Sequence, residues 1–217
     1  MKPPLIFSFS MWSQAVPLVA GVAAHRRLTS ARVWIMFWCA VYLIMNLAGR
    51  YLGARGLNNH FLSYVALPVQ CLGVMWALSL WQVRPTARLT LRLAVPAFLL
   101  AFIALTLLLE DPRNFSTIAE PVYSIVALGA AIATLLTRSP DETGPLLHQD
   151  WFWICCGLIL HFGALAVLTP FAAHYLVTDP QLMNSAYVIR GYINTAAFVI
   201  IAIGISCPSP VRPGPFF

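Results

Sequence analysis

Two charged side chains, Glu120 and Arg190, lie inside apolar stretches of the chain, and their types could bind a polar ligand or each other. Glu120 is five residues into the apolar run 115–137, and Arg190 is six residues into the run 184–206. At about 1.5 Å per helical residue, the two opposite charges reach nearly the same depth in a membrane. A buried charge is costly without a partner, so we expect an ion pair between the two helices. This pair is either a structural link or a ligand-binding pair, and snorkelling of Arg190 to the outer headgroups is the third interpretation.

Other polar residues share helix faces with these two charges. Tyr187 and Asn194 lie at helical spacing from Arg190, and Tyr123 lies at helical spacing from Glu120. Residues of this kind also occur in the first, second, third and sixth apolar runs. The candidate ligand-binding residues are Glu120, Arg190, Tyr187, Asn194, Tyr123, His60, Tyr64, Asn46, Gln70 and His161.

Almost all of this polarity falls in one half of the predicted membrane spans, the outer half, and the inner half is close to pure hydrocarbon. A transporter needs a polar path to both faces, whereas a site open to one side needs polarity on that side only. We therefore expect a one-sided polar pocket rather than a continuous pore. The competing interpretation is that these groups only join helices to one another by hydrogen bonds.

The elements that must position these residues are membrane-spanning helices. The chain has 217 residues, of which 60% are hydrophobic and 9% charged, and its mean hydropathy is +0.79. A soluble domain is nearer half apolar and a quarter charged, so lipid must be the solvent. We predict an all-α bundle of seven transmembrane helices in a single domain, at 5–24, 32–50, 60–82, 90–109, 115–137, 150–172 and 184–206.

The basic residues predict the orientation of the bundle. Cytoplasmic loops carry an excess of Lys and Arg. One side holds Arg26, Arg27, Arg32, Arg84, Arg88, Arg92, Arg138 and Arg212, and the other holds Lys2, Arg50, Arg55 and Arg113. Eight against four places the N-terminus outside and the C-terminus inside. The cluster His25-Arg26-Arg27 after the first run favours a retained helix over a cleaved signal peptide.

Several chemistries find no support in the residues. The only lysine is Lys2, which excludes a retinal Schiff base in the last span, and no two histidines have the helical spacing that haem ligation favours. No catalytic motif or metal-ligand cluster is visible, and the scattered charges do not suit nucleic acid. We expect the acidic residues of the 138–150 loop to form a solvated turn, and the cysteines to be small buried hydrophobes. The acidic residues are Asp141, Glu142 and Asp150, and the cysteines are Cys39, Cys71, Cys155, Cys156 and Cys207.

The motifs that carry a resemblance are Asn59-His60 through Tyr64 and Pro68-Val69-Gln70 in the third span, Glu120 in the fifth, and Asp150-Trp151-Phe152-Trp153-Ile154 opening the sixth. They resemble those of a group of bacterial seven-helix inner-membrane proteins of no established function. The similarity covers most of the chain, although Gln70 stands where that group is expected to carry an acid. The resemblance implies a shared fold and a bacterial inner-membrane location.

These observations predict a non-enzymatic membrane protein that binds or senses a small molecule or lipid headgroup. No cofactor is expected, and the expected partners are membrane lipids. A first alternative is an accessory subunit of a larger membrane complex, with protein partners in the membrane. A second is a small carrier of three plus one plus three helices, because the run 33–44 faintly resembles 150–161 and the run 62–70 faintly resembles 185–194.

Overall fold

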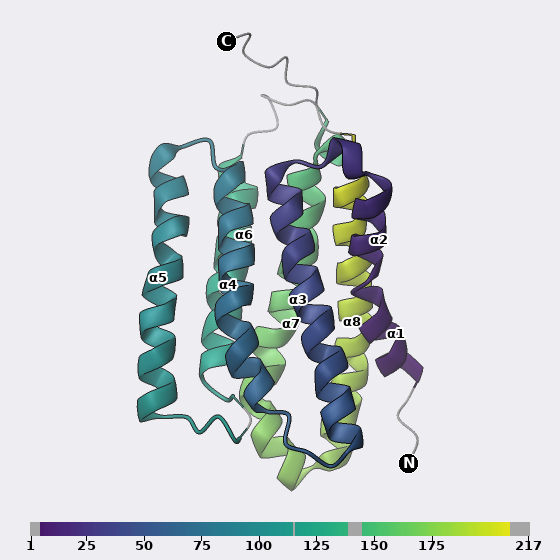
Figure 1. Cartoon of the computed structure of the whole chain (residues 1–217), viewed down its shortest axis with the longest axis vertical. Coiled ribbons are helices and arrows are strands. Elements are labelled where there is room, and N and C mark those ends of the chain that lie inside the picture. The colour runs from purple at the N-terminus through teal and green to yellow at the C-terminus, as the bar shows by residue number, and fades with distance from the viewer. Residues whose placement is uncertain (1–4, 115, 139–144, 209–217) are drawn as a thin grey trace.

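A computed structural model describes residues 5–114, 116–138 and 145–208, and within these ranges the chain is helical and contains no strand (Figure 1). Two short 3-10 turns precede α3 and α7. The helices are α1 (Leu5–Ser13), α2 (Val16–Ala23), η1 (His25–Arg27), α3 (Ser30–Ala54), α4 (Phe61–Trp81), α5 (Pro85–Leu108), α6 (Ala119–Thr137), η3 (Leu146–His148), α7 (Asp150–Thr178) and α8 (Pro180–Ser206).

Six of these helices, α3 to α8, contain segments long and apolar enough to cross a membrane. This confirms a bundle of the kind that integral membrane proteins form, in which each backbone polar group is satisfied within its own helix. The region predicted as the first span, 5–24, is instead divided between α1 and α2. The break falls at Gln14 and Ala15, and Pro17 in the first turn of α2 suits a new helix start because it has no N–H to donate.

Consecutive long helices run in opposite directions, so their connections alternate between the two ends of the bundle (Figure 1). We call the end with the α3–α4, α5–α6 and α7–α8 connections the α3–α4 end, and the other the α2–α3 end. In the view of Figure 1, α3 and α4 lie in front of α7 and α6, α1 and α2 lie against α8, and α5 stands at one edge. The order of the helices is compatible with the predicted three-plus-one-plus-three layout, and an internal repeat stays a prediction.

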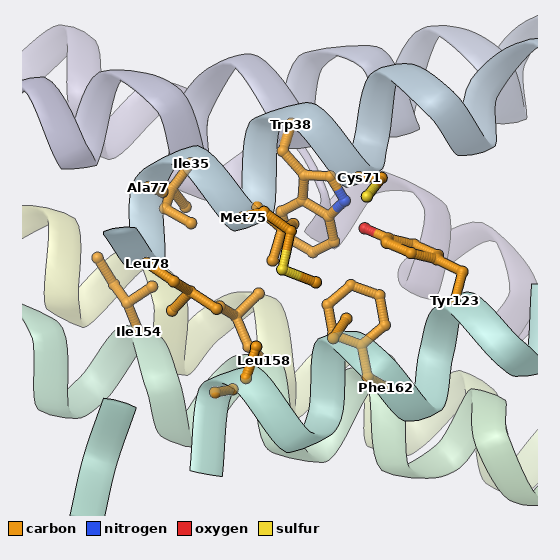
Figure 2. Packing of buried hydrophobic residues seen from close by; sticks show 14 of the residues in the cluster. Ile35, Trp38, Cys71, Met75, Ala77, Leu78, Tyr123, Ile154, Leu158 and Phe162 are labelled. Atoms are coloured by element: carbon orange, nitrogen blue, oxygen red, sulfur yellow. The ribbon is translucent and has the colours of Figure 1, made fainter. Parts of the chain in front are cut away.

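The core is a continuous apolar cluster between the helix layers (Figure 2). Trp38 of α3 is fully buried and stacks on Phe198 of α8, with ring centroids 5.6 Å apart. Met75 of α4 and Phe162 of α7 are fully buried in the same cluster. The cysteines behave as expected, because all are free and only Cys156 is more than marginally exposed.

Helices α7 and α8 approach closely because glycines remove side chains from their contact. A Cβ atom on Gly157 of α7 would lie 2.5 Å from Ile201 Cγ1 and 2.8 Å from the carbonyl oxygen of Ala197. A Cβ atom on Gly204 of α8 would lie 2.9 Å from the carbonyl oxygen of Asp150. Small residues at such contacts let backbones of membrane helices pack by van der Waals attraction.

We expect Gly157→Ala to destabilise the bundle, because the new methyl group meets backbone atoms that cannot move aside cheaply. The expected loss is about 1–3 kcal/mol, the usual cost of overpacking, measured by unfolding of the purified protein in mixed micelles. Gly163→Ala is the control on the same helix, since nothing lies within 4 Å of its Cβ position. Equal stability of the two variants would contradict the close contact.

Candidate ligand-binding site

A cavity of about 450 Å³ opens at the α3–α4 end. Residues of α3, α4, α6, α7 and α8 form its walls, and Gly53 and His60 at its mouth are exposed. The polar residues that line it are Tyr42, Asn46, Arg50, Asn59, His60, Ser63, Gln70, Glu120, Tyr123, Ser124 and Arg190.

A second cavity of about 390 Å³ adjoins the first, between α1, α3 and α8. The two share four lining residues, Tyr42, Asn46, Arg50 and Arg190. We call the shared region the junction. Beyond the junction, Gln14, Tyr187 and Asn194 contribute to the lining of the second cavity.

Eight of the ten residues predicted from the sequence line one or both of these cavities. Glu120, Tyr123, His60 and Gln70 line the first, Tyr187 and Asn194 line the second, and Arg190 and Asn46 line both.

The two remaining candidates, Tyr64 and His161, line neither cavity. The hydroxyl of Tyr64 donates to the carbonyl oxygen of Asp111 at 3.4 Å, so this side chain turns toward the α5–α6 connection. His161 is fully buried among aromatic rings, and its Nδ1 forms a 3.0 Å hydrogen bond with the side-chain oxygen of Asn194. His161 thus supports the wall of the second cavity from behind.

Sequence reasoning did not place Tyr42, Arg50 and Asn59 among the candidates. A signal was present, because Tyr42, Asn46, Gly49 and Gly53 recur at intervals of four, three and four, the spacing of one helix face. The glycines leave space on that face. Asn59 closes the rim by donating to the carbonyl oxygen of Gly49 at 2.9 Å.

Glu120 lies at the start of α6, and this helix start is held by the carboxylate of Glu110 from the preceding connection. Glu110 Oε1 accepts from the backbone N–H of Ile118 at 2.7 Å, and the hydroxyl of Ser116 accepts from the backbone N–H of Glu120 at 3.1 Å. These bonds satisfy N–H groups that a helix start leaves without partners. Glu120 itself lies in the first turn, where a negative charge is favoured by the helix dipole.

Glu120 and Arg190 do not form the predicted ion pair. They face the first cavity from α6 and α8 and interact electrostatically, but within the described ranges the only ion pair at contact distance is Arg32–Asp150. The guanidinium of Arg190 instead lies near Tyr42 and 6.0 Å from the ring centroid of Tyr187. The prediction from equal depth thus places both charges at one cavity, but the two side chains are not in contact.

Tyr123 lines the same cavity and also reaches the core. Figure 2 shows its hydroxyl pointing toward Cys71 and Trp38. The hydroxyl is buried and has no hydrogen-bond partner among the described residues.

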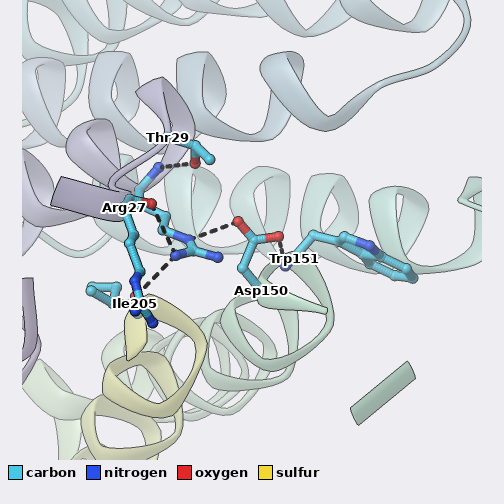
Figure 3. A network of polar contacts seen from close by, with 6 residues as sticks. Arg27, Thr29, Asp150, Trp151 and Ile205 are labelled. Carbon is cyan, nitrogen blue, oxygen red and sulfur yellow. Dashed lines mark hydrogen bonds and ion pairs between the residues drawn. The ribbon is translucent and has the colours of Figure 1, made fainter. Parts of the chain in front are cut away.

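The prediction that the inner half of the spans, at the α2–α3 end, is close to pure hydrocarbon is wrong. Arg32 is fully buried there, and its Nε lies 2.8 Å from Oδ2 of Asp150 (Figure 3). Its Nη1 donates to the carbonyl oxygens of Ile205 at 3.3 Å and Arg27 at 3.4 Å. Arg32 was expected to be a loop charge and Asp150 part of a solvated turn, but both turn inward because each partners the other. Asp141 and Glu142 lie outside the described residues.

A second buried polar group at this end joins α4 to α6. Gln82 Nε2 donates to Thr134 Oγ1 at 2.7 Å, and Thr137 Oγ1 donates to Gln82 Oε1 at 3.3 Å. These polar side chains at the α2–α3 end contact one another, although Nη2 of Arg32 has no hydrogen-bond partner among the described residues. Those at the α3–α4 end surround two cavities.

Two double-mutant cycles distinguish these arrangements. We expect Arg32→Gln and Asp150→Asn each to cost about 3–5 kcal/mol of unfolding free energy, because each leaves the other charge buried and unpaired. The double variant should recover much of that loss. Glu120→Gln and Arg190→Gln should cost less, and their costs should add within about 0.5 kcal/mol.

Reversible unfolding in lipid–detergent micelles measures both cycles. A coupling energy between Glu120 and Arg190 as large as that between Arg32 and Asp150 would show that the first pair is a structural link.

Within the described ranges, no group of three or more His, Cys, Asp or Glu side chains is placed to hold a metal ion. No protein-family model, curated protein or solved structure matches the chain. The resemblance to bacterial seven-helix proteins therefore stays a prediction, and the site must be interpreted from its own geometry.

Proposed function

We propose that this is a non-enzymatic membrane protein that binds or senses a small molecule or a lipid headgroup at the α3–α4 end. The observation that carries the proposal is that polar and charged side chains from four helices and from the α3–α4 connection line a cavity of about 450 Å³. Ligand cavities commonly measure roughly 300–1,000 Å³ and combine apolar walls with a few placed polar groups.

The contrast between the two ends supports binding over a purely structural role. Polar groups that only join helices are expected to contact one another, as Gln82 and Thr134 do. Glu120 and Arg190 instead face open volume, and a guest would supply the partners that each lacks at ion-pair distance. A charge in a membrane interior without such partners is costly.

The same contrast favours a one-sided site over a carrier. A carrier needs a polar path that reaches both faces of the membrane. The polar groups at the α2–α3 end are packed against one another, with Arg32 fully buried and Gln82 nearly so. A path through that end would require these bonds to break.

We further propose that the α3–α4 end faces the outside of a bacterial inner membrane. The α2–α3 end carries the exposed Arg26, Arg27, Arg84 and Arg88 in its connections and first helical turns. Positive charge of this kind favours the cytoplasmic side. The cavity would then be reached from the periplasm or the outer leaflet.

Gly49→Leu tests the proposed function by filling the first cavity. A Cβ atom at Gly49 meets only ordinary contacts, at 3.7 Å from Asn59 and Leu62, so a longer side chain can enter the cavity without displacing the helices. We expect the wild-type protein to carry a small molecule or lipid through purification in mild detergent, and Gly49→Leu to lose it. Native mass spectrometry of the intact protein measures the bound mass.

Gly129→Leu is the matched control, because Gly129 is exposed on α6 and nothing lies within 4 Å of its Cβ position. It should retain the bound mass. The same adducts on both variants and on the wild type would place the bound molecule outside this cavity. Co-purification of fixed protein partners without a bound small molecule would favour the accessory-subunit alternative.

The orientation is tested by labelling introduced cysteines in intact cells with a membrane-impermeant maleimide. We expect Leu57→Cys in the α3–α4 connection to be labelled, and Leu147→Cys at the opposite end to be labelled only after the cells are opened. Both positions are exposed, so access to the reagent depends on the side of the membrane. The reverse pattern would invert the proposed topology.

A further inference from the structure

Two arginines from different helices line the junction of the cavities. Arg50 of α3 and Arg190 of α8 line both cavities, whereas Glu120 lines only the first. Among the residues that the structure describes, Glu120 is also the single carboxylate in either lining. With two guanidinium groups and one carboxylate, the combined lining is positively charged.

Neither guanidinium is neutralised by a carboxylate at contact distance in the described part of the chain. Arg50 donates to the sulfur of Met11 at 3.4 Å, which is a weak acceptor. Arg190 lies near Tyr42 and the Tyr187 ring. This differs from Arg32, whose Nε and Nη1 have a carboxylate and two carbonyl oxygens as acceptors.

The two other residues of the junction, Tyr42 and Asn46, are engaged by the protein itself, and the Tyr42 side chain interacts with Arg190. Asn46 Nδ2 donates to the side-chain oxygen of Gln14 at 3.2 Å and to the carbonyl oxygen of Tyr42 at 2.9 Å. These bonds fix the wall between the cavities and leave the arginines as its main donors. A guanidinium stays charged and matches the paired oxygens of carboxylate and phosphate groups.

We propose that the ligand is an anion, held at the junction through a phosphate or carboxylate group that bridges Arg50 and Arg190. This rests on the proposed function and adds the charge class of the ligand. Glu120, on another wall of the first cavity, disfavours a second anionic group there. Leu67 and Leu165 in the same cavity provide apolar contacts for the uncharged part of the ligand.

The experiment measures thermal unfolding of the purified full chain in non-ionic detergent at constant ionic strength. Its probes are inorganic phosphate, acetate, and micelles doped with phosphatidylglycerol or, as the zwitterionic comparison, phosphatidylcholine. We expect at least one anionic probe to raise the unfolding temperature in a saturable way. A response to phosphatidylglycerol alone identifies a lipid headgroup as the source of the anion, and a response to phosphate or acetate identifies a free anion.

Charge variants locate the bound anion. Arg50→Gln and Arg190→Gln should each weaken the apparent affinity about tenfold or more, because each removes a charge-assisted hydrogen-bond donor. Glu120→Gln should strengthen it, because a repelling carboxylate is lost. Arg55→Gln is the matched control: Arg55 follows α3 and stacks over Tyr51 at 4.4 Å, and it lines neither cavity, so its loss should leave the affinity unchanged.

The outcomes separate this inference from the proposed function. If Arg55→Gln weakens anion binding as much as Arg50→Gln does, the effect is surface potential and the inference is wrong. A second outcome is that Gly49→Leu loses a bound molecule that is neutral or cationic, and that Glu120→Gln weakens the binding of this molecule. In that case a ligand site exists, and only the charge that we assign to the ligand is wrong. If no anionic probe binds and Gly49→Leu changes nothing, both proposals are wrong. Arg50 is exposed, so its substitution tests the inference even if Arg190→Gln does not fold.

Discussion

A fully buried guanidinium, that of Arg32, ties three helices together, and the arrangement of the bundle depends on this contact. In a medium without water, such a charge is tolerable only where acceptors surround it. Asp150 at the start of α7 and the carbonyl oxygen of Ile205 near the end of α8 provide them for a side chain of α3. Gly204 lets the backbones of α7 and α8 approach at the same place. The α2–α3 end is therefore closed by contacts between α3, α7 and α8.

At the α3–α4 end, by contrast, neighbouring residues position the polar side chains, but these side chains still face the cavities. His161 holds Asn194, Gln14 holds Asn46, and the Glu110 carboxylate fixes the helix start that carries Glu120. Such supporting bonds fix the orientation of side chains that line the cavities. A closed end opposite an end with polar cavities is the arrangement that a one-sided binding site requires.

Hydropathy along the chain predicts the long helices well, because the length and apolar character of a span are local properties. It also identifies most of the polar residues that line the cavities, since a charge such as Arg190 in an apolar run must face the interior. It does not predict pairing. The depth of a residue in the membrane does not show which helices are neighbours in the bundle. Equal depth therefore predicts an ion pair between Glu120 and Arg190 that the structure does not contain. Arg32 looks like any loop arginine at a span boundary, and only its distant partner Asp150 reveals that it is buried.

The most direct test of this account is an experimental density map of the protein in nanodiscs formed from its native membrane. The account predicts density for a bound molecule at the junction of the cavities, in contact with the guanidinium groups of Arg50 and Arg190. A map with no such density, in which the guanidinium of Arg190 reaches ion-pair distance from the carboxylate of Glu120 and closes the space between them, would contradict it.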